Sequence, residues 1–223
     1  MKRLLLAAAF VGGVAAAAGA WALVPPAPKE RSATELMDAL MWGREPVGGP
    51  FVLIDHNGER RTDADFRGKL VAIYFGFTFC SDVCPTDLQA IGLAIDRLGP
   101  AGAAVQPLFI TVDPEKDTPE QLKSYVALFH PRMIGLTGDP REIRKLALAY
   151  KAYYAKADPP RDAGRDIDHT GFIYLVGPDG GYLGFAPPGT TPERLAAILS
   201  RALAHDRSSA IPNSRGRISS ASR

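Results

Sequence analysis

The chain has 223 residues, 46% of them hydrophobic, and a formal net charge of +2, which leaves room for one packed domain of ordinary size. Lys2 and Arg3 carry +2 and the arginine-rich tail from His205 carries +3, so residues 4–204 carry a net −3. This mildly acidic body argues against a nucleic-acid-binding face, and we expect no nucleic-acid partner.

The N-terminal segment, residues 4–28, contains no charged residue. Residues 4–24 are 21 apolar or small residues, about the length of a membrane-spanning helix and longer than the apolar core of a signal peptide. We therefore expect residues 1–28 to be a single retained membrane anchor. A signal peptide cleaved near Ala18-Gly19-Ala20 is the alternative. In either case Lys2 and Arg3 place the remaining chain across the membrane under the positive-inside rule.

Residues 29–47 are expected to be a linker that contains a short helix. Ser32-Ala-Thr-Glu35 has the pattern of a capping box, and Leu36, Met37, Leu40 and Met41 follow it on one helical face. Met37 and Met41 could be read as metal ligands, but packing of this short helix is the interpretation that we favour.

Residues 48–204 alternate strand patterns with helix patterns, which predicts an α/β domain with a mixed sheet flanked by helices. The predicted strands are 51–54, 70–77, 105–112, 133–136, 169–176 and 181–185, with a half-buried strand surface at 150–154. Helices are predicted at 86–98, after Pro119, from Asp139 to Tyr150, and from Thr191 onward. Asn57-Gly58 indicates an N-terminal hairpin, and Pro178-Asp-Gly-Gly indicates a second hairpin.

The tail, residues 205–223, is rich in serine, arginine and glycine and shows no periodicity. We expect it to be disordered.

The only two cysteines, Cys80 and Cys84, follow the apolar run 70–77 and are expected on the first turn of the next helix. At this spacing they would share one helical face with Cα atoms about 6 Å apart, within reach of a disulfide. Backbone amides and the helix dipole would stabilise a thiolate there. The pair could cycle between disulfide and dithiol, or bind a soft metal ion.

His169 is the best-placed candidate for a third ligand, because it follows a long polar loop and has Asp168 and Thr170 beside it. From the residues alone, a structural role for this histidine stays open. His56 is interpreted as a solvated turn residue and His130 as a contact to a helix C-terminus. Asp113 and Asp117 are interpreted as turn and capping residues, although they could tune a nearby metal site.

Four stretches closely resemble the Sco/SenC family of copper-delivery proteins: residues 48–51, 76–88, 111–119 and 168–171, in family order. The resemblance extends from about Gly48 to Leu203. It implies a thioredoxin-like fold on a membrane anchor, and copper, as Cu(I) or Cu(II), held by Cys80, Cys84 and His169. Phe79 and Ser81 stand where many members have histidine and proline.

The resemblance implies a copper metallochaperone that delivers copper to the binuclear centre of a cytochrome c oxidase subunit. The domain would face the periplasm or the mitochondrial intermembrane space, and its partners would include that subunit, a thiol reductant and possible further copper carriers. The chemical softness of these ligands is consistent with copper, since two thiolates and one imidazole suit Cu(I), whereas zinc prefers four ligands.

A thiol–disulfide oxidoreductase that reduces the cysteines of the recipient is the alternative, with Cys80 and Cys84 as its redox pair. Whether the chain is an enzyme therefore stays open. The spacing Cys-x3-Cys and the absence of a tryptophan before Cys80 separate it from a generic thioredoxin-like reductase.

Overall fold

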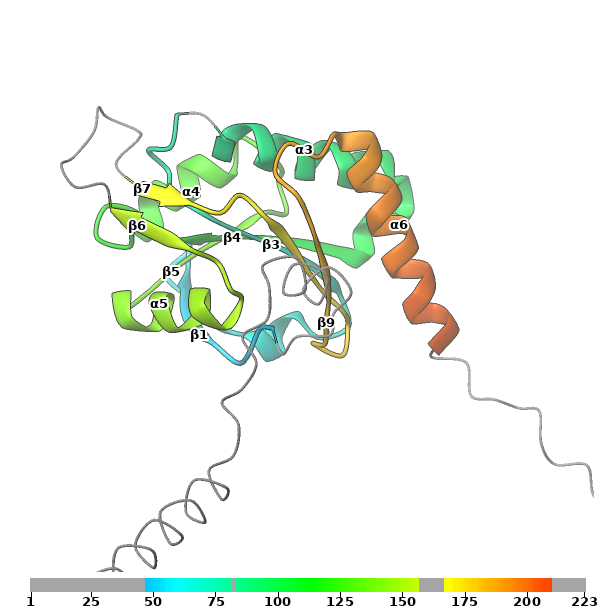
Figure 1. The fold of residues 1–223 in the computed structure, drawn as a ribbon, viewed down its shortest axis with the longest axis horizontal. Coiled ribbons are helices and arrows are strands. Elements are labelled where there is room, and N and C mark those ends of the chain that lie inside the picture. The colour runs from blue at the N-terminus through cyan, green and yellow to red at the C-terminus, as the bar shows by residue number, and fades with distance from the viewer. Residues whose placement is uncertain (1–46, 82, 157–166, 210–223) are drawn as a thin grey trace, which may run out of the picture. The chain divides into compact units, whose positions relative to one another are not determined.

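The computed structural model describes residues 47–81, 83–156 and 167–209 (Figure 1). The expected anchor at 1–28, the linker up to residue 46 and the last part of the tail, 210–223, lie outside this range. Within the described ranges, no helix combines the length and the apolar character that crossing a membrane requires.

A seven-stranded mixed sheet in the order β2-β1-β5-β4-β3-β8-β9 forms the centre of the domain. Its strands are β1 (Val52–Asp55), β2 (Arg60–Thr62), β3 (Leu70–Gly76), β4 (Val105–Thr111), β5 (Ile134–Thr137), β8 (Ile173–Val176) and β9 (Tyr182–Ala186). Strands β3, β4 and β5 are parallel, and the other pairs are antiparallel. The predicted mixed sheet and the N-terminal hairpin, β1–β2, are confirmed.

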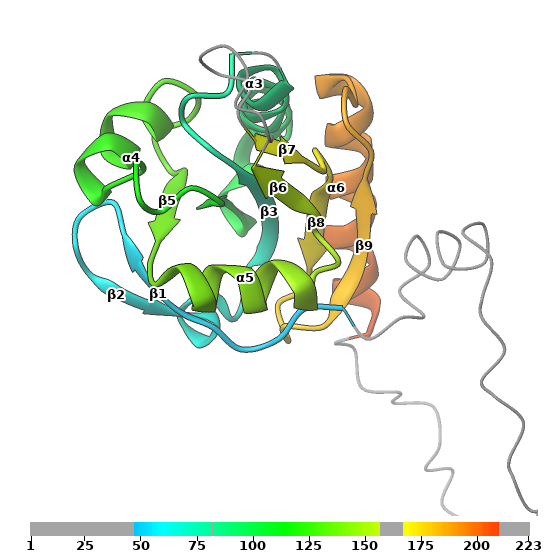
Figure 2. The same cartoon turned by 60° about the vertical axis from the view of Figure 1, so that its left-hand side comes forward.

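Helices cover both faces of this sheet (Figures 1 and 2). One apolar cluster contains residues of α3 (Val83–Arg97), α4 (Pro119–Val126) and α6 (Pro192–Ser209), and the other contains residues of α5 (Pro140–Ala149). Short 3-10 helices, η1 (Asp63–Phe66) and η2 (Gly99–Ala104), precede β3 and β4.

Strand β3 is buried along its whole length because its side chains alternate between the two clusters. Ala72 and Tyr74 face the cluster of α3 and α6, whereas Ile73 and Phe75 face the cluster of α5. This two-sided burial explains the apolar run without a polar alternation in the sequence. The strand ends at Gly76, directly before the segment that carries the cysteines.

The predicted caps position two of the helices. Thr118 accepts a hydrogen bond from the backbone N–H of Gln121 at the start of α4, and Asp139 accepts one from Arg141 at the start of α5. In both helices a proline occupies the first turn, where its missing N–H leaves no donor unpaired.

The predicted single strand at 169–176 is wrong, because the chain there forms two separate strands. Strand β7 (Ile167–His169) pairs with β6 (Tyr154–Lys156) in a two-stranded sheet of its own, and β8 begins four residues later at Ile173. The predicted strand surface at 150–154 is wrong for the same region, since Tyr150 caps α5 and only Tyr154 enters β6.

The expectation of a disordered tail from residue 205 is also wrong for its first part. Helix α6 continues to Ser209, past the expected end of the domain. Extending an existing helix fixes one residue for each hydrogen bond gained, so a helix can continue beyond its last apolar position.

Candidate metal centre

Three side chains from distant parts of the sequence meet at the carboxyl end of β3: Cys80, Cys84 and His169. Their ligand atoms all lie within 4.8 Å of one another. Figure 2 shows β7, which carries His169, beside the first turn of α3, which carries Cys84. Within the part of the chain that the structure describes, no other group of three such side chains has this geometry.

The two cysteines occupy different kinds of backbone, contrary to the expectation that both lie on the first helical turn. Helix α3 begins at Val83, so Cys84 is helical. Cys80 lies in a turn instead, and its own backbone N–H donates to the carbonyl of Phe77 at 3.2 Å. Cys84 is fully buried and Cys80 is half-buried, and the two are not joined by a disulfide.

Gly76 makes room for the buried thiol. A Cβ atom added at this glycine would lie 2.9 Å from the Cys84 sulfur and 3.0 Å from the rings of Tyr74 and Phe109. The last residue of β3 therefore has to be small for Cys84 to sit against the strand.

The His169 ring is oriented by contacts on both nitrogens. Its Nε2 lies 3.1 Å from the Cys84 sulfur, and its Nδ1 lies 3.3 Å from the carbonyl oxygen of Thr170. A carbonyl can only accept, so Nδ1 donates to Thr170, and Nε2 is the ring nitrogen that faces the Cys84 sulfur. The Phe77 and Tyr74 rings also contact the imidazole in T-shaped arrangements, at centroid distances of 5.7 and 6.1 Å.

The Cys84 thiol is held in its protonated form. A hydrogen bond with Cys80 and burial both raise the pKa of Cys84 well above its usual range. This differs from the expectation that the helix N-terminus stabilises a thiolate, because here burial and the neighbouring sulfur outweigh the helix dipole. A metal ion bound by this sulfur would displace its proton.

Two buried polar residues behind Cys84 were missed by the sequence interpretation. The Tyr74 hydroxyl lies 3.2 Å from Asp87 Oδ2, and the N–H of Gly189 donates to Asp87 Oδ1 at 2.9 Å. Burial raises the pKa of Asp87 and, together with Cys84 and Asp87, that of Tyr74. The signal was a tyrosine inside an apolar strand, since a buried hydroxyl needs a partner.

The other two histidines considered as candidates do not join the site. His56 is half-buried rather than solvated, and its Nδ1 accepts the N–H of Gly135 at 3.1 Å. His130 is buried, and its Nδ1 accepts the N–H of Arg132 at 3.1 Å. Both therefore serve the fold through contacts that the local sequence does not reveal.

The three donors suit a soft metal ion. Thiolate and imidazole ligands lie about 2.0–2.3 Å from an ion such as zinc, so two of them are at most about 4.6 Å apart. The spacing in the structure is within a few tenths of an ångström of that limit. Cys80 and His169 are half-buried residues, so they are less enclosed than Cys84.

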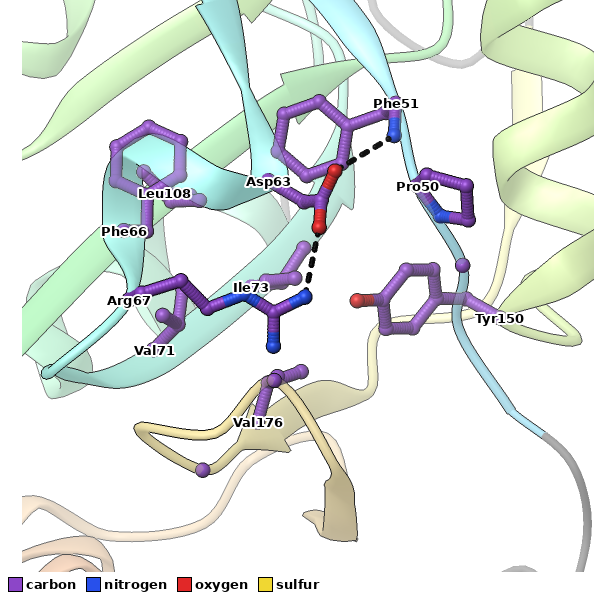
Figure 3. Close-up of a pocket in the computed structure, with 13 residues that line it drawn as sticks. Pro50, Phe51, Asp63, Phe66, Arg67, Val71, Ile73, Leu108, Tyr150 and Val176 are labelled. Atoms are coloured by element: carbon purple, nitrogen blue, oxygen red, sulfur yellow. Dashed lines mark hydrogen bonds and ion pairs between the residues drawn. The ribbon is translucent and has the colours of Figure 1, made fainter.

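A separate pocket of about 200 Å³ lies at the other end of the sheet (Figure 3). Its walls include Val71 and Ile73, from the first half of β3, and an ion pair of 2.9 Å between Arg67 and Asp63. The cysteines lie beyond the last residue of the same strand, so this pocket is not part of the candidate metal centre.

The fold and the site together define a thioredoxin-like domain with a candidate metal-ligand set of two thiols and one imidazole. The sequence model of the SCO1/SenC family matches residues 41–204, and the chain belongs to this family. The resemblance seen in the sequence and the predicted thioredoxin-like fold are thereby confirmed.

Individual relatives agree with this assignment. The human mitochondrial protein SCO1 homolog is 40% identical over 160 residues, which are 71% of this chain and 53% of that protein. The structure of Bradyrhizobium japonicum ScoI with copper bound is 43% identical, with a TM-score of 0.64 over 70% of this chain and 99% of that chain. A structure of BsSco is 26% identical, with a TM-score of 0.58 over 71% of this chain and 95% of that chain. That protein is described as having a disulfide switch and as a member of the Sco family of cytochrome c oxidase assembly proteins.

Proposed function

We propose that the chain binds one copper ion through Cys80, Cys84 and His169 and delivers it to a copper-bearing subunit of cytochrome c oxidase. The convergence of these donors carries the proposal, because Cys84 and His169 are 85 residues apart in the sequence and 3.1 Å apart in the structure. The copper bound by the similar ScoI protein and the role in oxidase assembly given for the Sco family support it.

The burial of the ligands suggests an order of transfer. Cys84 is fully buried, whereas Cys80 and His169 are half-buried. Ligands of the recipient would replace Cys80 and His169 first, and the Cys84 sulfur would release copper last and take up a proton again. Since the pKa of Cys84 is raised, this reprotonation favours release.

The domain organisation belongs to the proposal. Residues 48–204 would form the copper-binding domain, held by an anchor at 1–28 through the linker 29–47, in the periplasm or the intermembrane space. The anchor would keep the copper site near a membrane-bound oxidase.

The alternative, a thiol–disulfide oxidoreductase, has one specific observation in its favour. The Cys80 and Cys84 thiols hydrogen-bond each other, so the pair is placed for oxidation to a disulfide. A disulfide switch has been identified in the similar protein BsSco. Both activities would use the same cysteines, but only copper delivery requires His169 as a ligand.

A transfer assay with the full chain in detergent separates the two functions. The copper-loaded chain is mixed with the copper-free recipient domain, in either its dithiol or its disulfide form, and copper and free thiols are measured on both. Copper delivery predicts that the wild type metallates the dithiol form and that His169→Ala abolishes transfer. If His169→Ala reduces the disulfide form normally and the wild type transfers no copper, the oxidoreductase function is the correct one.

A further inference from the structure

The two halves of the candidate metal centre belong to segments that share no strand or helix. The cysteines follow β3 of the large sheet, whereas His169 ends β7 of the separate two-stranded sheet. Something must hold these segments in register if the three donors are to stay within 4.8 Å of one another. The loop between β4 and α4, residues 112–118, contacts both segments.

Asp117 connects this loop to the cysteine segment. Its side chain is fully buried, and its Oδ1 accepts the hydroxyl of Thr78 at 2.6 Å. Its Oδ2 accepts the backbone N–H of Thr78 at 3.0 Å and the hydroxyl of Thr111 at 2.5 Å. Thr78 lies two residues before Cys80, inside the turn that the Cys80 N–H closes onto Phe77. The carboxylate therefore fixes the start of the turn that presents the first thiol.

Neither of the roles predicted for Asp117 from sequence accounts for this side chain. The N-cap of α4 is Thr118, and the backbone carbonyl of Asp113, rather than a side chain, closes the turn by accepting the N–H groups of Lys116 and Asp117. A buried carboxylate is costly unless it is hydrogen-bonded. The hydrogen bonds found for Asp117 go to the cysteine segment and to the end of β4.

Lys156 connects the same loop to the histidine segment. Its ammonium lies 2.7 Å from Glu115 Oε2 and 3.9 Å from Oδ1 of the buried Asp113. Lys156 belongs to β6, and the register of the β6–β7 ladder places Tyr154 opposite His169. This ion pair is largely exposed, so its effect is smaller than that of Asp117.

We infer that the β4–α4 loop is a positioning loop that holds both halves of the site before the metal arrives, with Asp117 on the cysteine side and Glu115, Asp113 and Lys156 on the histidine side. This inference rests on the proposed function and names residues that tune it. Residues that orient metal ligands change metal affinity about 10–100-fold when they are lost.

The test compares four variants of the reduced full chain. Asp117→Ala removes all three hydrogen bonds at Thr78 and Thr111, and Asp117→Asn can keep an oxygen on the Thr78 N–H while its amide donates to the Thr78 hydroxyl. Lys156→Met removes the ammonium and keeps most of the stem. Asp55→Ala is the matched control, because Asp55 is equally buried and accepts N–H groups in a turn away from the site.

Cu(I) affinity is measured by competition with a chromophoric chelator. Two copper-free readouts accompany it: the alkylation rate of Cys80 by iodoacetamide, and the imidazole ¹⁵N shifts of His169. Asp117→Ala should weaken Cu(I) binding about 10–100-fold and change the alkylation rate, and Asp117→Asn should restore most of both. Lys156→Met should change the ¹⁵N shifts of His169 and weaken Cu(I) binding about two- to fivefold. High salt should weaken binding by the wild type in the same way, because it screens the exposed Lys156–Glu115 ion pair. Asp55→Ala should lower the melting temperature and leave affinity and both copper-free readouts unchanged.

Thr78→Val, which removes only the hydroxyl, replaces Asp117→Ala if that variant does not fold, and it should act in the same direction. Wild-type affinity and alkylation rate in a folded Asp117→Ala or Thr78→Val variant would overturn the inference. If the wild type itself bound no copper, the proposed function would fail, and the alkylation and ¹⁵N measurements would still decide the positioning role.

Discussion

At the scale of single residues, Gly76 decides how closely the Cys84 thiol approaches β3. Gly76→Ala would place a methyl group 2.9 Å from the sulfur and 3.0 Å from two rings. We predict a loss of about 1–3 kcal/mol in the free energy of unfolding from overpacking, and Cu(I) binding at least about tenfold weaker because the sulfur moves. Denaturation and chelator competition measure the two effects.

Gly49→Ala is the matched control, since a Cβ atom at Gly49 would meet nothing within 4 Å. It should leave stability and affinity close to those of the wild type. Equal copper affinity in the two alanine variants would contradict the role given to Gly76.

The protonation of Cys84 predicts how copper binding depends on pH. Its pKa is raised by the hydrogen bond with Cys80 and by burial, so the thiol is protonated at neutral pH, and binding must release that proton. Copper affinity should therefore rise with pH, by about tenfold per unit for each proton released. The protons released when copper is loaded anaerobically, recorded in weakly buffered solution at about pH 7, measure this coupling between binding and deprotonation. Loading without proton release would show that Cys84 is already a thiolate.

At the scale of elements, the junction between α4 and β5 contains a buried histidine that should make stability depend on pH. Burial lowers the pKa of His130, Arg132 adds to this effect, and Asp96 opposes it. The pKa of His130 in the folded state lies below its unfolded value of about 6.5. Between these two pKa values the unfolded state therefore binds more protons than the folded state. The free energy of unfolding should therefore fall as the pH drops below about 6.5.

His130→Asn isolates this contribution. An asparagine oxygen can accept the N–H of Arg132, as His130 Nδ1 does, but the amide does not titrate in this range. Urea denaturation at several pH values should show a steeper decline below about pH 6.5 in the wild type than in the variant. Parallel curves would mean that His130 has the same pKa in both states.

The end of α5 contains a second local feature that can be tested. Lys151 has a φ of +57°, the only positive φ of a non-glycine residue among the described residues. Glycine adopts this conformation without steric cost, so Lys151→Gly should raise the free energy of unfolding by about 0.5–1 kcal/mol. A decrease in chemical denaturation would show that the lysine side chain contributes more than its backbone strain costs.

These elements also show which structural features local sequence patterns predict and which they do not. The capped starts of α4 and α5 and the buried strand β3 follow from local spacing and were predicted, whereas the cysteine segment was only partly predicted, since Cys84 is helical and Cys80 is not. Tyr150, Tyr153 and Tyr154 resemble one strand, but Tyr150 caps the end of α5, Tyr153 lies between elements and Tyr154 begins β6.

At the scale of the whole molecule, the site depends on topology that local spacing cannot supply. The Cys80–Cys84 pair is visible in one stretch of sequence, but the approach of His169 requires a separate strand pair to lie over the end of β3. From the residues alone a structural role for His169 stayed open, and the family resemblance supplied the expectation. The roles of Tyr74 and Asp87 were not predicted, and for Asp117 an effect on a metal site was only the less favoured interpretation, because the partners Asp87, Gly189 and Thr78 are distant in the sequence from the residues they contact.

The fold places one thiol in the core and leaves the residues of the other two donors half-buried. Strands β3, β4 and β5 end on the same side of the sheet because they are parallel, and the site lies beyond β3. This arrangement suits a protein that must hold a metal ion and then give it up, since the buried sulfur retains the ion while the half-buried donors are replaced.

The most direct test of this function is the coordination of copper in the reduced full chain. Anaerobic titration with Cu(I), followed by X-ray absorption, should show about one copper per chain bound by two sulfur atoms and one imidazole nitrogen. His169→Ala should lose the nitrogen and weaken binding, while Cys80→Ser and Cys84→Ser should each lose a sulfur. A wild-type spectrum without nitrogen, or a spectrum and affinity unchanged by His169→Ala, would contradict the three-ligand copper site.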